Sequence, residues 1–264
     1  MTETVSFLDR NTHKLAFVKT DGDGPTLVWL GGFRSDMTGS KAIKVEEYAK
    51  ERGQANLRFD YAGHGESTGA FTDGSIGAWR DDARAMIEAE APGDVILIGS
   101  SMGGWIGLLL AMEEAQKAKA ENRPSRVKSL VLIAPAPDFT QDLMWATFSK
   151  DERERMVRDG RLEEESQYSD EPTIITHHLI EEGRNHLILG GSIEPGCPVR
   201  ILQGVADPDV PHTHALRIMD ALSGEDVVLT LIKDGDHRLS RDEDLAALVR
   251  TLDALPDQAR GPLS

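Results

Sequence analysis

The stretch that decides the fold is Asp94–Trp105, which reads DVILIGSSMGGW. Its first half, Val95–Ile98, is a short apolar run typical of a strand buried on both faces of a parallel sheet. Its second half is a G-x-S-x-G motif centred on Ser101, and the helical pattern of Trp105–Ala120 follows directly. A strand, a tight turn carrying a serine and a helix form the context of a nucleophile elbow. The stretch therefore predicts that Ser101 is a nucleophile at the end of a central strand.

The two flanking glycines of this motif have a steric reason. A sharp turn holds the serine in a strained backbone conformation, and side chains at Gly99 or Gly103 would clash with the neighbouring helix and strand. The amino end of the following helix also places partial positive charge beneath a developing oxyanion. A glycine-rich turn without chemistry is the alternative interpretation, and residues elsewhere in the chain have to decide between the two.

Short apolar runs and helical patterns alternate on both sides of this stretch. We expect strands over Lys14–Lys19, Thr26–Leu30, Asn56–Phe59, Val95–Ile98, Lys128–Ile133, Val199–Leu202 and Val227–Ile232. Ser240 and Glu243 form an expected capping box for a last helix, and Ala259–Ser264 is expected to fray. The alternation predicts an α/β fold with a mostly parallel, twisted sheet flanked by helices.

Residues 138–195 break this rhythm because they contain no convincing strand. A capping box of Ser149 and Glu152 starts a helix that Gly160 ends, and a second helix is predicted over Pro172–Leu189. An insertion of this length is small for an independent domain, so we interpret it as a helical lid. The predicted organisation is a core over residues 1–137 and 196–264, interrupted by a lid over residues 138–195.

The composition excludes several classes of protein. The 264 residues hold 29 Lys and Arg against 45 Asp and Glu, a net charge of −16. Such a chain is a poor partner for nucleic acid or for an anionic lipid surface, since both need clustered basic residues. With 39% apolar and 28% charged residues, the chain has the composition of a folded enzyme or binding protein and not of a disordered one.

The chain has a single cysteine, Cys197, so a secreted fold held by internal disulfides is excluded. No apolar run is long enough to span a bilayer. The first ten residues, MTETVSFLDR, show neither a secretory nor an organellar targeting pattern. The expected location is therefore cytoplasmic.

Two further residues complete the chemistry that a serine nucleophile requires, namely a base and an acid that orients it. Asp207 comes shortly after the predicted strand Val199–Leu202, and His237 comes shortly after Val227–Ile232. Ligands of open α/β sheets bind at this carboxyl-end edge of the strands. Asp209 is a competing acid, and Asp207 is preferred because it lies closer to its strand.

An oxyanion hole needs two backbone N–H groups. Met102, which follows the serine, supplies one, and a loop after an early strand supplies the other. The sequence Leu30-Gly31-Gly32-Phe33 ends such a strand, which makes the Phe33 N–H the second candidate. A plain glycine turn is the alternative for this loop.

These residues together resemble the α/β-hydrolase family, in which the order along the chain is serine, acid, histidine. Longer strings, among them GFRSDMTGSKA over 32–42, RFDYAGHGES over 58–67 and CPVR over 197–200, are similar to one subgroup. That subgroup includes a mitochondrial palmitoyl-protein thioesterase that also acts as a mycophenolic acid acyl-glucuronide esterase. The resemblance covers about Thr26 to Leu255 and is weakest in the lid.

The resemblance implies that Ser101 is the nucleophile, Asp207 the acid and His237 the base of an esterase or thioesterase that needs no metal or cofactor. The substrate would be a small acyl ester or thioester, or an acylated protein. A non-catalytic protein of the same fold that binds a ligand or partner is the alternative, and so is the use of the same three residues on peptides or C–C bonds. His64, in the loop Gly63–Glu66, is expected to be structural. A His212–His214 metal pair is weighed as a weaker possibility.

Overall fold

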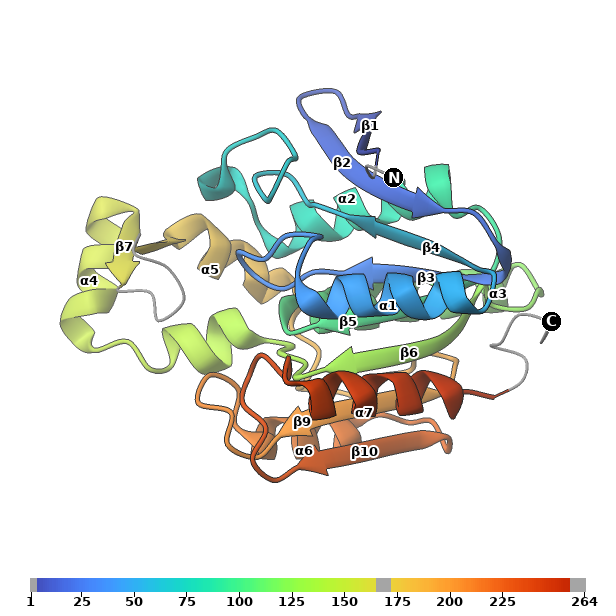
Figure 1. Cartoon of the computed structure of the whole chain (residues 1–264). Coiled ribbons are helices and arrows are strands. Elements are labelled where there is room, and N and C mark those ends of the chain that lie inside the picture. The colour runs from blue at the N-terminus through green and yellow to red at the C-terminus, as the bar shows by residue number, and fades with distance from the viewer. Residues whose placement is uncertain (1–3, 165–171, 257–264) are drawn as a thin grey trace.

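The computed structural model describes residues 4–164 and 172–256. The predicted frayed tail, Ala259–Ser264, lies outside them. Eight strands form the central sheet in the order β1-β2-β4-β3-β5-β6-β9-β10 (Figure 1). Their bounds are β1 Ser6–Asp9, β2 Lys14–Thr20, β3 Asp23–Leu30, β4 Gln54–Phe59, β5 Val95–Ser100, β6 Val127–Ile133, β9 Val199–Gly204 and β10 Val227–Ile232. Only the β1–β2 and β2–β4 pairs are antiparallel, so the predicted mostly parallel sheet is confirmed.

Helices cover both faces of the sheet. One face carries α1 (Ser40–Glu51) and α7 (Asp242–Asp253), which lie in front of the sheet in Figure 1. The other face carries α2 (Ile76–Glu90), α3 (Met102–Ala120) and α6 (His212–Ala221). In the part of the chain that the structure describes, no helix has both the length and the apolar character that crossing a bilayer requires.

The strand β5 shows how its sequence produces the two cores. Ile96 and Ile98 belong to the cluster under α1 and α7, whereas Val95 and Leu97 belong to the cluster under α2 and α3. All four side chains are at most 1% exposed. Complete burial of such a side chain stabilises the fold by about 1.5–3 kcal/mol. A continuous apolar run therefore gives a central strand that is fixed from both sides.

The insertion between β6 and β9 extends from the carboxyl-end edge of the sheet, at the left of Figure 1. Its elements are η2 (Thr140–Trp145), α4 (Lys150–Asp159), β7 (Arg161–Glu164), β8 (Thr173–Thr176), α5 (His177–Gly183) and η3 (Arg184–His186). The carboxylate of Asp138 accepts the backbone N–H groups of Ile188 (2.8 Å) and Leu189 (2.9 Å), which ties the two ends of the insertion together.

The expectation that this insertion holds no strand was wrong. β7 and β8 form an antiparallel pair, and the helix predicted over Pro172–Leu189 begins only at His177. The residues Thr173–Thr176 are all β-branched, a composition that favours a strand, and Ile175 is buried in a small core with Met156 and Leu162. Thr176 then caps α5 by accepting the Leu179 N–H at 3.1 Å.

The two predicted capping boxes had different outcomes. The box of Ser149 and Glu152 is present, and Gly160 ends α4 in the left-handed conformation, as expected. The box of Ser240 and Glu243 was wrong, because α7 begins one residue later. Asp244 instead accepts the backbone N–H of Arg241 and pairs with its guanidinium group.

A contact without side chains fixes α3 against the sheet. A Cβ atom on Gly103, in the first turn of α3, would overlap the carbonyl oxygen of Leu30 and would come within 2.6 Å of that of Gly31. The end of β3 and the start of α3 therefore approach as bare backbone. No rotamer of a larger residue relieves this contact, since the overlap is between the first side-chain atom and backbone.

We expect Gly103→Ala to destabilise the fold by about 1–3 kcal/mol, because the added methyl group overpacks this contact. Urea unfolding followed by circular dichroism measures the change. Gly93→Ala is the matched control, since a Cβ there meets nothing within 4 Å, and we expect it to change stability by less than about 1 kcal/mol. Equal effects of the two substitutions would contradict the steric argument.

Candidate active site

Ser101 stands at the junction of β5 and α3 in a strained backbone conformation, with φ +53° and ψ −116°. A non-glycine residue in this region costs about 1–3 kcal/mol. The surroundings hold it there: its N–H donates to the Ile133 carbonyl (2.9 Å), and its own carbonyl accepts the Ala136 N–H (3.1 Å). A Cβ on Gly99 would overlap the Gly103 carbonyl, which confirms the steric reason for both glycines.

His237 lies between Ser101 and Asp207, although Ser101 is 136 positions away in the chain. Its Nε2 is 3.1 Å from Ser101 Oγ, and its Nδ1 is 2.8 Å from Asp207 Oδ2. A carboxylate can only accept, so Nδ1 carries the ring proton of the neutral histidine and Nε2 is left to accept from the serine hydroxyl. The structure thus brings together the three residues that were predicted from the sequence to be nucleophile, base and acid.

Asp207 is buried and held by four hydrogen bonds. Besides His237, its oxygens accept from Gln203 Nε2 (3.1 Å) and from the N–H groups of Asp209 (2.9 Å) and Val210 (2.8 Å). Burial raises the pKa of this carboxyl, but the hydrogen bonds and the nearby His237 outweigh burial and leave the pKa below its usual value. Asp209, the competing acid, contributes its backbone N–H to Asp207, and it is Asp207 that contacts the histidine.

Bare backbone also brings the Asp207 and His237 loops together. A Cβ on Gly204 would overlap the Gly235 carbonyl, and the Ala206 N–H donates to that same carbonyl at 3.0 Å. Neither these two glycines nor Gln203 was predicted from the sequence as part of the site. The available signal was a polar residue followed by a glycine at the end of an otherwise apolar strand.

The two expected oxyanion donors flank Ser101. Gly32 lies close to the serine, since a Cβ on it would be 3.5 Å from Ser101 Cβ. Met102 is the first residue of α3, where an N–H has no partner within the helix. Within residues 4–164 and 172–256, neither the Phe33 nor the Met102 N–H donates to another group. The Phe33 ring is anchored against Phe71 and Phe139, with centroids 5.0 and 5.7 Å away.

Ligand atoms of Asp207, Asp209 and His237 lie within 4.8 Å of one another, a spacing at which a metal ion can bind. Both oxygens of Asp207 already accept two hydrogen bonds each. The arrangement therefore suits proton transfer from serine to histidine better than ion binding. The weaker idea of a His212–His214 metal pair finds no support, because the buried His214 ring bonds to the Pro137 carbonyl at 2.8 Å.

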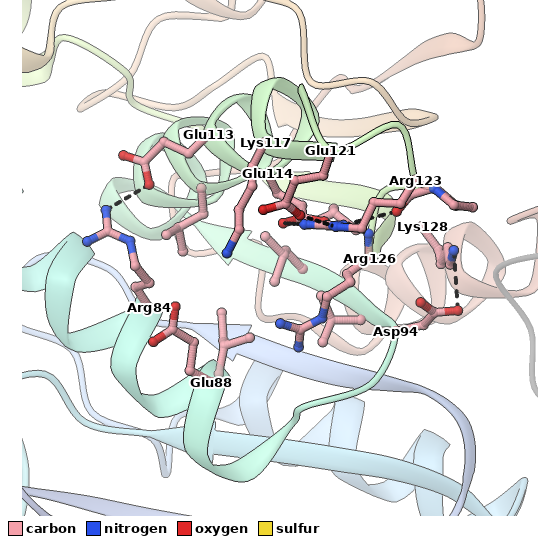
Figure 2. Close-up of a pocket in the computed structure, with 16 residues that line it drawn as sticks. Arg84, Glu88, Asp94, Glu113, Glu114, Lys117, Glu121, Arg123, Arg126 and Lys128 are labelled. Atoms are coloured by element: carbon pink, nitrogen blue, oxygen red, sulfur yellow. Dashed lines mark hydrogen bonds and ion pairs between the residues drawn. The ribbon is translucent and has the colours of Figure 1, made fainter. Parts of the chain in front are cut away.

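A cavity of about 630 Å³ lies at the opposite edge of the sheet, at the amino ends of β5 and β6 (Figure 2). Its charged side chains pair with one another: Arg84 with Glu113 (2.7 Å), Arg123 with Glu114 (2.6 Å) and Lys128 with Asp94 (3.2 Å). Ser101 follows the carboxyl end of β5, so this cavity is no part of the site. A smaller cavity of about 310 Å³ separates the loop after β3 from Pro172 and Ile174 of the insertion.

Residues 27–251 match the family described as the alpha/beta hydrolase family. The chain belongs to that family. It is a hydrolase, as the sequence predicted, and the predicted fold class is confirmed by the family match and by similar structures.

Two relatives that share one name, from mouse and from human, make the family assignment more specific. The chain is 35% identical over 257 residues to the mouse palmitoyl-protein thioesterase ABHD10, mitochondrial, covering 97% of this chain and 83% of the relative. The human protein of the same name is 34% identical over 97% of this chain and 81% of its own. These matches confirm the subgroup that the sequence strings indicated.

Two solved structures are similar to this chain in both fold and sequence. A protein from Agrobacterium vitis S4 has a TM-score of 0.88 at 44% identity and covers 96% of this chain and 98% of its own. The mouse alpha/beta hydrolase domain-containing protein 10 has a TM-score of 0.87 at 33% identity, with 97% and 100% covered.

The choice between the two acids is open to a direct test. We expect Asp207→Asn to lower kcat about 10⁴-fold, since an amide no longer fixes the histidine tautomer that accepts the serine proton. Asp209→Asn keeps the N–H that Asp207 uses, so we expect kcat within about threefold of the unmodified enzyme. Steady-state hydrolysis of a chromogenic ester by both variants measures this. A larger loss in Asp209→Asn would reverse the assignment.

Cys197 offers a test of which nucleophile acts. Burial raises the pKa of its thiol to about 12, and only a thiolate attacks efficiently. We expect iodoacetamide at pH 7.5 to leave ester hydrolysis unchanged and a fluorophosphonate to abolish it. Loss of activity with iodoacetamide, together with an inactive Cys197→Ala variant, would indicate that the cysteine is the nucleophile instead.

Proposed function

We propose that this chain hydrolyses acyl thioesters through a covalent acyl-enzyme, with Ser101 as nucleophile, His237 as base and Asp207 as acid. The observation that carries the proposal is the hydrogen-bonded chain from Asp207 through His237 to the strained Ser101. The intact set of three residues disfavours the alternative of a non-catalytic binding protein.

The geometry supports an ordered sequence of proton transfers. As Ser101 Oγ attacks the acyl carbon, His237 Nε2 accepts its proton, and the ionised Asp207 stabilises the resulting imidazolium. The N–H groups of Phe33 and Met102 hold the tetrahedral oxyanion. His237 then returns the proton to the departing thiol or alcohol. Water repeats the same steps on the acyl-enzyme, which releases the carboxylic acid and restores Ser101.

The acyl group proposed here is a long saturated chain. The support is similarity over 97% of the chain to proteins named palmitoyl-protein thioesterases. The insertion over residues 138–195 lies at the same sheet edge as the serine (Figure 1), and we propose that it acts as a lid over the acyl group. An acylated protein is then one natural substrate and a small acyl thioester or ester another.

The cellular location stays a prediction from the sequence. The relatives carry the word mitochondrial in their names, whereas the location predicted for this chain is the cytoplasm. The net charge of −16 continues to disfavour nucleic acid as a partner.

We expect the enzyme to hydrolyse acyl thioesters of 4 to 16 carbons with kcat/KM highest for the longest soluble chains, and to hydrolyse the matched oxygen esters more slowly. A thiol-reactive dye and a pH indicator follow the two series. Ser101→Ala is the blank, and we expect it to lose about 10⁶-fold in kcat.

The chain-length optimum decides the acyl group. A preference for acetyl or aryl oxygen esters would replace the long-chain proposal with a short-chain esterase. Equal rates for the unmodified enzyme and Ser101→Ala would overturn the serine mechanism altogether.

A further inference from the structure

His64 is a buried polar residue to which the proposed mechanism assigns no role. It lies in the loop after β4 and is 3% exposed. Its Nδ1 is 3.2 Å from the Ala62 carbonyl oxygen, and its Nε2 is 3.2 Å from the backbone nitrogen of Arg34. A carbonyl oxygen can only accept, so Nδ1 carries the proton. Nε2 is therefore the acceptor of the Arg34 N–H.

The Arg34 N–H belongs to the tight turn that carries the oxyanion donor Phe33. The Ser35 N–H donates to the Gly32 carbonyl at 3.1 Å, which closes a turn over Gly32–Ser35. Arg34, the third residue, has φ +58°. A positive φ at this position is typical of a type II turn, where glycine or asparagine is preferred. An arginine adopts it only when the surroundings hold it.

The orientation of one peptide distinguishes this turn from the commoner type I turn. The two types differ by a flip of the central peptide, which here joins Phe33 to Arg34. In the observed turn, the N–H of that peptide points to His64 Nε2. The Phe33 N–H belongs to the preceding peptide, so the bond to His64 holds the peptide directly next to the oxyanion donor. Without this acceptor, the Gly32–Ser35 turn loses the bond that fixes its central peptide, and the Phe33 N–H can shift relative to the nearby Ser101. An oxyanion donor works only within about 2.7–3.1 Å of the oxygen.

The surroundings keep His64 neutral and fixed in place. Burial lowers its pKa to about 4, with the Arg34 charge adding to the effect and the bond to Ala62 opposing it. The ring packs edge-on against Phe71 and Trp79, with centroids 5.2 and 5.1 Å away. The Trp79 indole N–H donates to the same Ala62 carbonyl at 3.1 Å. The ring therefore presents an unprotonated Nε2 to the turn.

We infer that His64 is a positioning residue for the oxyanion hole: by accepting the Arg34 N–H, it holds the type II turn in which the Phe33 N–H faces the acyl oxygen. The inference rests on the proposed function, because it assigns His64 a task in that reaction. It predicts that changes at His64 alter stabilisation of the transition state more than substrate binding.

A pair of substitutions separates the acceptor from the rest of the ring. The amide oxygen of His64→Gln can reach the place of Nε2, whereas the shorter His64→Asn reaches only the place of Nδ1. We expect His64→Asn to lower kcat about 10–100-fold with KM within about threefold, and His64→Gln to recover most of this loss. His214→Gln is the matched control, since His214 is also 3% exposed but bonds to Pro137 and not to the turn.

An inhibitor that mimics the oxyanion tests whether His64 contributes to oxyanion binding. An acyl trifluoromethyl ketone adds to Ser101 and places a charged oxygen in the hole, so we expect its Ki to rise in His64→Asn by the same factor by which kcat/KM falls. Thermal unfolding of all three variants records the structural cost. A loss of melting temperature in His64→Asn equal to that of His214→Gln, with kcat and Ki unchanged, would overturn the inference.

Two further results keep the test informative. ¹⁵N NMR of the unmodified enzyme reports the tautomer of His64 without any substitution, and a proton on Nε2 would overturn the inference. An unmodified enzyme that cleaves no ester or thioester would overturn the proposed function, and the inference with it. An active enzyme that is indifferent to His64→Asn overturns the inference alone.

Discussion

The close approach of three stretches of backbone around Ser101 is the constraint on which the rest of the site depends. β5 turns into α3 within one residue, and the end of β3 lies directly against the first turn of that helix. Side chains at Gly99 or Gly103 would separate these elements. Because they are absent, Ser101 is held at φ +53°. The same contact places the Gly31–Gly32 loop beside the serine, so nucleophile and oxyanion donors share one cause.

The parallel sheet brings together site residues that are far apart in the sequence. β5, β9 and β10 all end at one edge, and the loops that follow them carry Ser101, Asp207 and His237. Loops leaving parallel strands at a common edge converge there whatever their separation in sequence. A backbone contact between Gly204 and Gly235 brings the last two loops within reach of each other. The hydrogen bonds of the site follow from this placement.

The features that could be predicted from the sequence are those that depend on residues close together in the chain. Apolar runs such as Val95–Ile98 and the G-x-S-x-G motif need no knowledge of the partner strands, and both predictions agree with the structure. The helix predicted over Pro172–Leu189 was wrong over its first residues, because Thr173–Thr176 pair with β7 as a strand. This pairing is a non-local contact. The start of α7 was wrong for a local reason, since Asp244 accepts the Arg241 N–H and pairs with its guanidinium group, which places the cap one residue later than predicted. The catalytic roles of Ser101, Asp207 and His237 remain predictions, although their proximity is now a structural observation.

Arg34 connects the oxyanion turn to the insertion, and this limits how independently the two can vary. Its backbone N–H bonds to His64, while its guanidinium group donates to the Pro172 carbonyl (2.8 Å) and to Thr173 Oγ1 (3.0 Å) at the start of β8. The sequence strings that resemble the thioesterase subgroup lie outside the insertion. A substitution near Pro172 therefore acts on a residue adjacent to the expected oxyanion donor. If the insertion acts as the proposed lid, changes in acyl preference and in turnover are coupled through the Arg34 side chain.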